Sequence, residues 1–198
     1  MINRKERHMA PGIPDEFFIR GQVPMTKEEV RAVTLAKGKL FPEAIVYDLG
    51  SGTGSIAIEA ALLAPRGRVY AYERNPEAVS LIKQNRDRFE VTNLEILCKE
   101  APQGLEELPK AHTVFIGGSG GRLREILAKS LAKLQPKGRI VLNAITLETL
   151  QTGLAFAREE NLKVEAVTLS VSRLEEIGKS HWWKALNPIN IITLIKEE

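Results

Sequence analysis

The stretch Asp48-Leu49-Gly50-Ser51-Gly52-Thr53-Gly54, followed by Glu73, decides the fold of this chain. The apolar run 44–47 before it predicts a buried strand, and the small residues at 55–64 after it predict a helix. Glycines at alternate positions let the backbone turn sharply and approach a ligand, because no Cβ is in the way. Glu73 follows a second apolar stretch, where an acidic side chain can accept both ribose hydroxyls of a nucleoside. This order of features predicts a nucleoside-cofactor site.

The spacing of the glycines indicates which cofactor binds. A dinucleotide fingerprint reads Gly-x-Gly-x-x-Gly, whereas here the pattern is Gly-x-Gly-x-Gly and follows Asp48 directly. The Asp48 carboxylate would repel a pyrophosphate and suits a cationic amino-acid group better. The pattern resembles the S-adenosylmethionine loop of the Rossmann-like methyltransferases. That resemblance implies that the glycine backbone lies under the methionine portion and that Glu73 binds the ribose.

Length and composition favour one globular enzyme domain. At 198 residues, with 43% hydrophobic and 27% charged residues, we expect a single domain over 1–198, with 1–11 as a loose amino-terminal arm. The net charge of +3 suits an acidic small molecule or RNA and demonstrates neither. Cys98 is the single cysteine, which excludes an internal disulfide and favours a reducing cytoplasm. No run of eighteen apolar residues occurs, so we expect no membrane segment.

Strand and helix patterns alternate along the rest of the chain. This alternation predicts an α/β fold of the Rossmann-like methyltransferase class, with a mostly parallel seven-stranded sheet covered by helices on both faces. A longer connection over 174–188 favours an antiparallel last strand. Strands are expected near 44–49, 68–73, 94–98, 112–117, 138–144, 163–172 and 189–196. Helices are expected near 26–40, 54–64, 75–88, 102–108, 121–134 and 147–160, with Thr26 and Asn75 as N-caps and 136–138 as a helix stop.

Ligands of open α/β sheets bind beyond the carboxyl ends of the strands, so the segments after each strand hold the candidate site residues. Arg74 follows the second strand, and Glu100 and Ala101 follow the third, where they can read the adenine amine. The glycine-rich loop after the fourth strand leaves room for a large ligand beside the methyl group. The candidates for positioning the substrate are Gly118, Ser119 and Asn143, and the cofactor candidates include Gly117.

Missing motifs narrow the reaction. No Asn/Asp-Pro-Pro-Tyr sequence follows the fourth strand, and no cysteine near the site could add to a pyrimidine. None of the three aspartates (Asp15, Asp48 and Asp87) follows strands four or five, which argues against a magnesium site, so we expect no metal. The acceptor is therefore expected to be an activated carbon or heteroatom, and no catalytic base is assigned.

Three motifs resemble those of one family. The segments Gly12-Ile13-Pro14-Asp15-Glu16-Phe17, 23–31 (VPMTKEEVR) and Phe115-Ile116-Gly117-Gly118-Ser119-Gly120-Gly121 are similar to those of the decarboxylating precorrin methyltransferases of cobalamin biosynthesis. The resemblance runs from about Gly12 to the end of the chain. Two positions depart from it, since His112 opens the fourth strand where Asp is expected, and Lys99-Glu100 replaces Gly-Asp.

The resemblance implies methylation of C15 of a cobalt-precorrin, loss of carbon dioxide from the C12 acetate, a homotetramer and a functional partner that methylates C5. It also implies that Met25 and Thr26 close over the cofactor. A substrate with many carboxylates predicts a basic mouth, for which Arg20, Arg122 and Arg124 are candidates, with Gly120 providing space and Arg173 and Lys179 as further choices.

Two other functions fit the cofactor loop. An RNA methyltransferase would need a basic stripe or an added RNA-binding module, and neither is visible in the sequence, so we expect no nucleic-acid partner. A non-catalytic S-adenosylmethionine-binding subunit would keep the loop and lack a substrate cavity.

Overall fold

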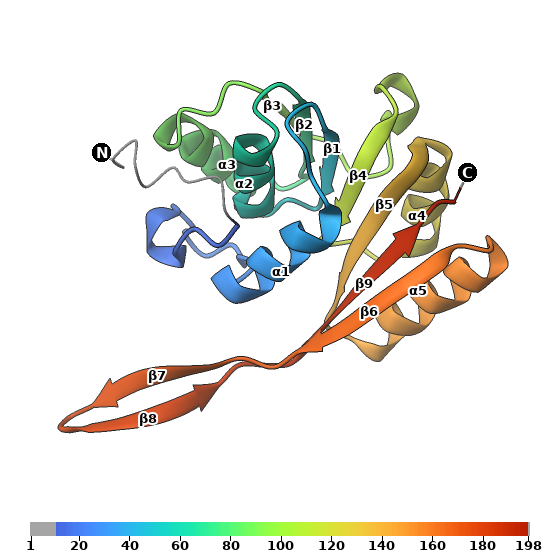
Figure 1. Ribbon diagram of the computed structural model, residues 1–198. Coiled ribbons are helices and arrows are strands. Elements are labelled where there is room, and N and C mark those ends of the chain that lie inside the picture. The colour runs from blue at the N-terminus through green and yellow to red at the C-terminus, as the bar shows by residue number, and fades with distance from the viewer. Residues whose placement is uncertain (1–10, 198) are drawn as a thin grey trace.

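The computed structural model describes residues 11–197, so the predicted arm at 1–11 lies outside them apart from Pro11. Their main feature is a seven-stranded sheet with the order β3-β2-β1-β4-β5-β9-β6 (Figure 1). β9 runs antiparallel to both β5 and β6, and the remaining neighbours are parallel, which confirms the predicted fold class. The strands are β1 (Ile45–Leu49), β2 (Arg68–Tyr72), β3 (Leu94–Leu97), β4 (Ala111–Ile116), β5 (Leu134–Ala144), β6 (Lys163–Leu169) and β9 (Ile189–Ile195).

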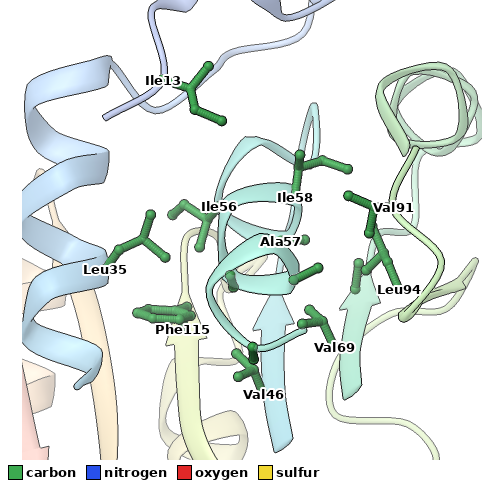
Figure 2. Close-up of a cluster of buried hydrophobic side chains, with 14 of the residues drawn as sticks. Ile13, Leu35, Val46, Ile56, Ala57, Ile58, Val69, Val91, Leu94 and Phe115 are labelled. Atoms are coloured by element: carbon green, nitrogen blue, oxygen red, sulfur yellow. The ribbon is translucent and has the colours of Figure 1, made fainter. Parts of the chain in front are cut away.

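Helices cover both faces of this sheet because apolar side chains along its strands point alternately to one face and to the other. Val46 of β1 points to the layer that holds α1 and α2, and Tyr47 points to the layer that holds α4 and α5. Figure 2 shows the first layer, in which Leu35 of α1 and Ile56 of α2 lie near Phe115 of β4. The helices are α1 (Glu28–Gly38), α2 (Ser55–Leu63), α3 (Pro76–Arg88), α4 (Leu123–Ala132) and α5 (Leu147–Glu159). None of the described helices is both long enough and apolar enough to cross a membrane.

The helix starts were predicted with mixed success. Asn75 caps α3 as expected, because its side chain accepts a hydrogen bond from the Glu77 amide at 2.9 Å. The expectation for Thr26 was wrong: Lys27 is the N-cap residue of α1, and no side-chain cap bond forms there. The Thr26 carbonyl instead accepts a hydrogen bond from the Arg31 guanidinium. α1 also ends at Gly38 rather than near Leu40, because Lys39 takes a left-handed backbone conformation.

Two segments, 102–108 and 136–138, differ from the prediction. The residues 136–138, expected to stop a helix, lie inside β5, because α4 has already ended at Ala132. β5 accommodates them through a register shift, since Ala111 pairs with Leu134 whereas Thr113 pairs with Arg139. The helix expected at 102–108 is only the short 3₁₀ turn η3 (Leu105–Glu107). A second 3₁₀ turn, η2 (Asp15–Phe17), lies ahead of α1.

A long hairpin replaces the irregular connection expected between the last two strands. β7 (Ser172–Ile177) and β8 (Ser180–Ala185) pair antiparallel and project away from the sheet as continuations of β6 and β9 (Figure 1). Leu174 and Trp183 are register partners on this hairpin and are 55% and 68% exposed. The hairpin therefore presents apolar side chains that no described residue covers.

Candidate active site

A cavity of about 580 Å³ lies at the carboxyl ends of the central strands. The glycine loop after β1 and the segment 23–27 ahead of α1 line this cavity. The base of the hairpin, including Val171 and Leu186, also contributes to its wall. Most of the lining side chains are apolar, and the polar ones converge from Thr26, Lys27, Ser51, Glu73, Asn75, Asn143 and Asn187. Such a site suits a large apolar ligand with a few fixed polar groups.

A smaller cavity of about 190 Å³ adjoins the first. Gly50 and Glu73 line both cavities, so the two cavities adjoin at the glycine loop as two halves of one site. Glu100 and Ala101, the candidates expected at the adenine, line the smaller half together with the cofactor candidate Arg74 and the substrate candidate Gly120. Arg74 and Glu100 form an ion pair at 2.8 Å across this half.

Glu73 connects the glycine loop to the start of α3. One carboxylate oxygen accepts a hydrogen bond from the Gly52 amide at 2.9 Å, and the other accepts one from the Asn75 amide at 2.9 Å. Gly52 has a φ of +56°, a conformation that side chains with a Cβ rarely adopt. Glu73 therefore holds the loop in its turned form while its carboxylate lines both halves of the site.

Three of the cofactor candidates, Asp48, Thr53 and Gly54, line neither cavity. Asp48 is buried, and its Oδ2 atom has no hydrogen-bond partner among the described residues. Burial raises the pKa of Asp48 to about 7, an effect that the Ser51 hydroxyl and the Ala57 amide only partly offset and that the negative charge of Glu73 increases. Thr53 is also buried, and Gly54 packs against Ile82 of α3. Gly50, Ser51 and Gly52 are thus the loop residues that line the larger cavity.

An ion-pair network holds the segment ahead of α1 over the site, and sequence reasoning missed it. Arg31 is fully buried, pairs with Glu59 of α2 and donates to the carbonyls of Ile13 and Thr26. The Gly12 and Ile13 amides donate to the same Glu59 carboxylate. These contacts place Met25 and Thr26 along the larger cavity, where closure over a ligand was expected.

The loop after β4 and the end of β5 form the side of the site beyond the glycine loop. Gly117 lines the larger cavity, and Gly118 and Ser119 line the smaller one. Asn143 at the end of β5 lines the larger cavity, and its Oδ1 atom accepts a hydrogen bond from the Thr34 hydroxyl at 3.0 Å. This contact from α1 fixes the orientation of the Asn143 amide. The three positioning candidates therefore surround one site.

The basic candidates are less well placed. Arg20 is exposed and lines neither cavity, and Arg124 pairs with Glu159 of α5 on the outer surface. Arg122 pairs with Glu125 and lies 3.7 Å from Glu100, which places it beside the smaller cavity. Arg173 binds Glu29 and Asp15, at 2.7 and 3.0 Å. Lys179 is at the hairpin tip. Cavity-lining Lys27 was not among the candidates.

The donor set does not suggest a metal. Among residues 11–197, no cluster of three or more His, Cys, Asp or Glu side chains is positioned to hold an ion.

Comparisons with known proteins point to one family. Residues 16–196 match the model of the precorrin methyltransferase domain. The cobalt-precorrin-6B C(15)-methyltransferase (decarboxylating) of Salmonella typhimurium is 44% identical over 186 residues, which cover 93% of this chain and 96% of the relative.

Two solved structures are also similar. The precorrin-6y C5,15-methyltransferase of Geobacter metallireducens has a TM-score of 0.90 at 39% identity and covers 96% of this chain and 100% of its own. The precorrin 8w decarboxylase of Methanobacterium thermoautotrophicum has a TM-score of 0.86 at 34% identity and covers 92% of this chain and 98% of its own.

Proposed function

The chain belongs to the precorrin methyltransferase family, and we propose that it is a decarboxylating cobalt-precorrin-6B C15-methyltransferase of cobalamin biosynthesis. The observation that carries this proposal is the site in two adjoining halves, which share Gly50 of the glycine loop and Glu73 as lining residues. A nucleoside methyl donor fits one side of such a site, and the large apolar remainder suits a macrocycle.

S-adenosylmethionine fits the residues around the glycine loop. The proposed cofactor contacts are Met25, Thr26, Gly50, Ser51, Gly52, Glu73, Arg74, Glu100, Ala101 and Gly117, which all line the two cavities. Asp48, Thr53 and Gly54 line neither cavity, and the Asp48 carboxylate would add negative charge close to a cationic ligand once it ionises above about pH 7. When bound, S-adenosylmethionine supplies a methyl group activated by its sulfonium.

The protein groups act mainly by positioning the acceptor. A reduced tetrapyrrole carbon is already nucleophilic through its conjugated nitrogens, so alignment with the methyl group supplies much of the rate enhancement. Asn143 and the loop residues Gly118 and Ser119 border the space where that carbon would lie. The hairpin base contributes Leu169, Val171, Leu186 and Pro188, an apolar wall that suits the face of a macrocycle. Arg122 lies at the edge of the site, where it can bind a peripheral carboxylate.

The proposal also covers the source of the carbon dioxide, a partner enzyme and the assembly of the protein. We assign the lost carbon dioxide to the C12 acetate and propose a C5-methyltransferase as functional partner, since the Geobacter metallireducens relative is named for both C5 and C15. We also propose a homotetramer in the cytoplasm. The exposed apolar residues of the hairpin support assembly, because monomers rarely expose such groups together.

Mass analysis tests the reaction directly. The protein is incubated with S-adenosylmethionine and enzymatically prepared cobalt-precorrin-6B, and the tetrapyrrole is then analysed. One methyl gained and one carbon dioxide lost is the expected result. A methyl gain without carbon dioxide loss would assign the decarboxylation to another protein. An unchanged tetrapyrrole, with S-adenosylmethionine binding shown in parallel, would contradict the proposal and favour an RNA methyltransferase or a non-catalytic binding subunit.

A further inference from the structure

Lys27 is a cation in a mostly apolar cavity. Of the described residues that line the 580 Å³ cavity, it is the single lysine, and no arginine is among them. Its side chain forms no ion pair within residues 11–197, not even with Glu73, which lines the same cavity. Lys27 is a partly buried residue that lines this cavity without an acidic partner, so its ammonium is free to pair with an anionic ligand there.

The position of Lys27 on its helix is unfavourable for a cation. It is the N-cap residue of α1, where the partial positive charge of the helix end disfavours a cation. It also forms no side-chain cap bond that would stabilise the helix start. Local structure therefore gives no reason for a lysine at this position.

The arginines near the site already have acidic partners, and Lys99 lines only the smaller cavity. Arg31 is paired with Glu59, and Arg173 is bound by Glu29 and Asp15. Arg74 and Arg122 both lie within ion-pair distance of Glu100, on the side of the smaller cavity. Among the described residues that line the larger cavity, Lys27 is thus the cation without an acidic partner, and it is available to pair with a carboxylate that enters.

We propose that Lys27 is a specificity-determining residue whose ammonium pairs with a peripheral carboxylate of the tetrapyrrole substrate. This inference rests on the proposed function, because it takes the substrate to be an acidic macrocycle. The methionine portion of S-adenosylmethionine also carries a carboxylate. Lys27 is assigned to the substrate because it lines the same cavity as the apolar residues of the hairpin base. Binding of the cofactor alone does not require those apolar residues.

The test compares Lys27→Met with Lys83→Met. Methionine keeps the length of the side chain and removes the charge. Lys83 is an exposed lysine of α3 that lines neither cavity, so the second variant matches the change in net charge. Binding of cobalt-precorrin-6B is followed by its visible absorbance in the presence of S-adenosylhomocysteine, so the reading needs no turnover. Cofactor affinity is measured separately by calorimetry.

Lys27→Met should weaken tetrapyrrole binding by about 10- to 100-fold and leave cofactor affinity within about twofold of wild type. Lys83→Met should match the wild type in both assays, and Lys27→Arg should recover part of the tetrapyrrole affinity because it keeps the charge. Equal tetrapyrrole affinity of Lys27→Met and wild type would overturn the inference. A loss confined to S-adenosylmethionine would also overturn it and would assign Lys27 to the cofactor carboxylate. Wild-type protein that binds the tetrapyrrole but releases no methylated product would instead contradict the proposed function alone.

Discussion

Gly50 and Gly118 pack backbone against backbone, and this contact brings the loops after β1 and β4 together. A Cβ on Gly50 would stand 2.6 Å from the Gly118 carbonyl oxygen, and Gly50 itself has a φ of +75°. A Cβ on Gly118, by contrast, would meet no atom within 4 Å. The contact therefore requires glycine at position 50 but not at position 118, and Gly50 is in the proposed cofactor loop.

Gly50→Ala is expected to destabilise the protein, whereas Gly118→Ala is not. The first combines a left-handed backbone with a clash against main-chain atoms, so the melting temperature should fall by several degrees, which corresponds to about 2 kcal/mol. Thermal unfolding followed by circular dichroism measures both variants. Equal melting temperatures for the two would contradict the described packing of these loops.

Glu73→Gln is expected to weaken S-adenosylmethionine binding by about 10- to 100-fold. Each of its two carboxylate oxygens accepts a backbone amide, from Gly52 and from Asn75, and a glutamine has only one acceptor oxygen. Isothermal titration calorimetry measures the affinity. Glu77→Gln is the matched control, because Glu77 is exposed on α3 and lines neither cavity. Unchanged affinity would remove Glu73 from the cofactor site.

Asp48 should make cofactor binding depend on pH. Because burial raises its pKa to about 7, the carboxylate forms only as the pH rises through that value, and a cationic cofactor then binds more tightly. Affinity should increase by about tenfold between about pH 6 and about pH 8, and Asp48→Asn should flatten this change. Calorimetry across that range is the measurement, and an equal slope in the variant would assign the effect to another group.

The same group should lower stability as the pH rises. The folded protein keeps a proton that the unfolded chain releases at its ordinary pKa of 3.8. The contribution of Asp48 to the free energy of unfolding is therefore complete below 3.8 and is lost as the pH rises to about 7. Urea unfolding of wild type and Asp48→Asn at both ends of this window checks the sign.

Arg31→Met is expected to cost roughly 3–5 kcal/mol of stability, since it leaves the Glu59 carboxylate buried without its partner. Urea unfolding gives this value, and Arg31→Met/Glu59→Gln should recover part of it. Arg124→Met breaks the exposed pair with Glu159 and should change stability little. A small loss for Arg31→Met would mean that the network does not hold the segment ahead of α1.

Trp183→Glu is expected to reduce the proposed tetramer to smaller species. Trp183 and its partner Leu174 form an exposed apolar pair on the hairpin, and a charge there would oppose burial at a subunit contact. Light scattering coupled to size-exclusion chromatography measures the mass in solution. Lys179→Ala at the hairpin tip serves as control. A wild-type monomer, or a tetramer that survives the substitution, would contradict the role of this face.

The sequence predicted the parts of the molecule that depend on local patterns. The strand and glycine loop at 44–54 and the cap at Asn75 follow from apolar runs and turn residues, and the structure confirms them. The hairpin escaped prediction because none of its strand residues is buried, and β8 is exposed along its whole length, so the apolar alternation of a half-buried strand is missing. Arg31 and Glu59 are 28 positions apart, and their pairing arises only when α1 packs against α2.

The hairpin joins the sheet through two connections of unequal length, residues 170–171 between β6 and β7 and residues 186–188 between β8 and β9. The pairing therefore shifts by one residue at the root of the arm, since Leu169 pairs with Ile189 whereas Ser172 pairs with Ala185. The wall residues Val171 and Leu186 lie in these two connections. Added pairs of residues at the turn around Gly178 would leave Val171 and Leu186 where they are. A change in the length of the arm at its tip would thus spare the cavity wall, whereas an insertion at its root would alter the wall itself.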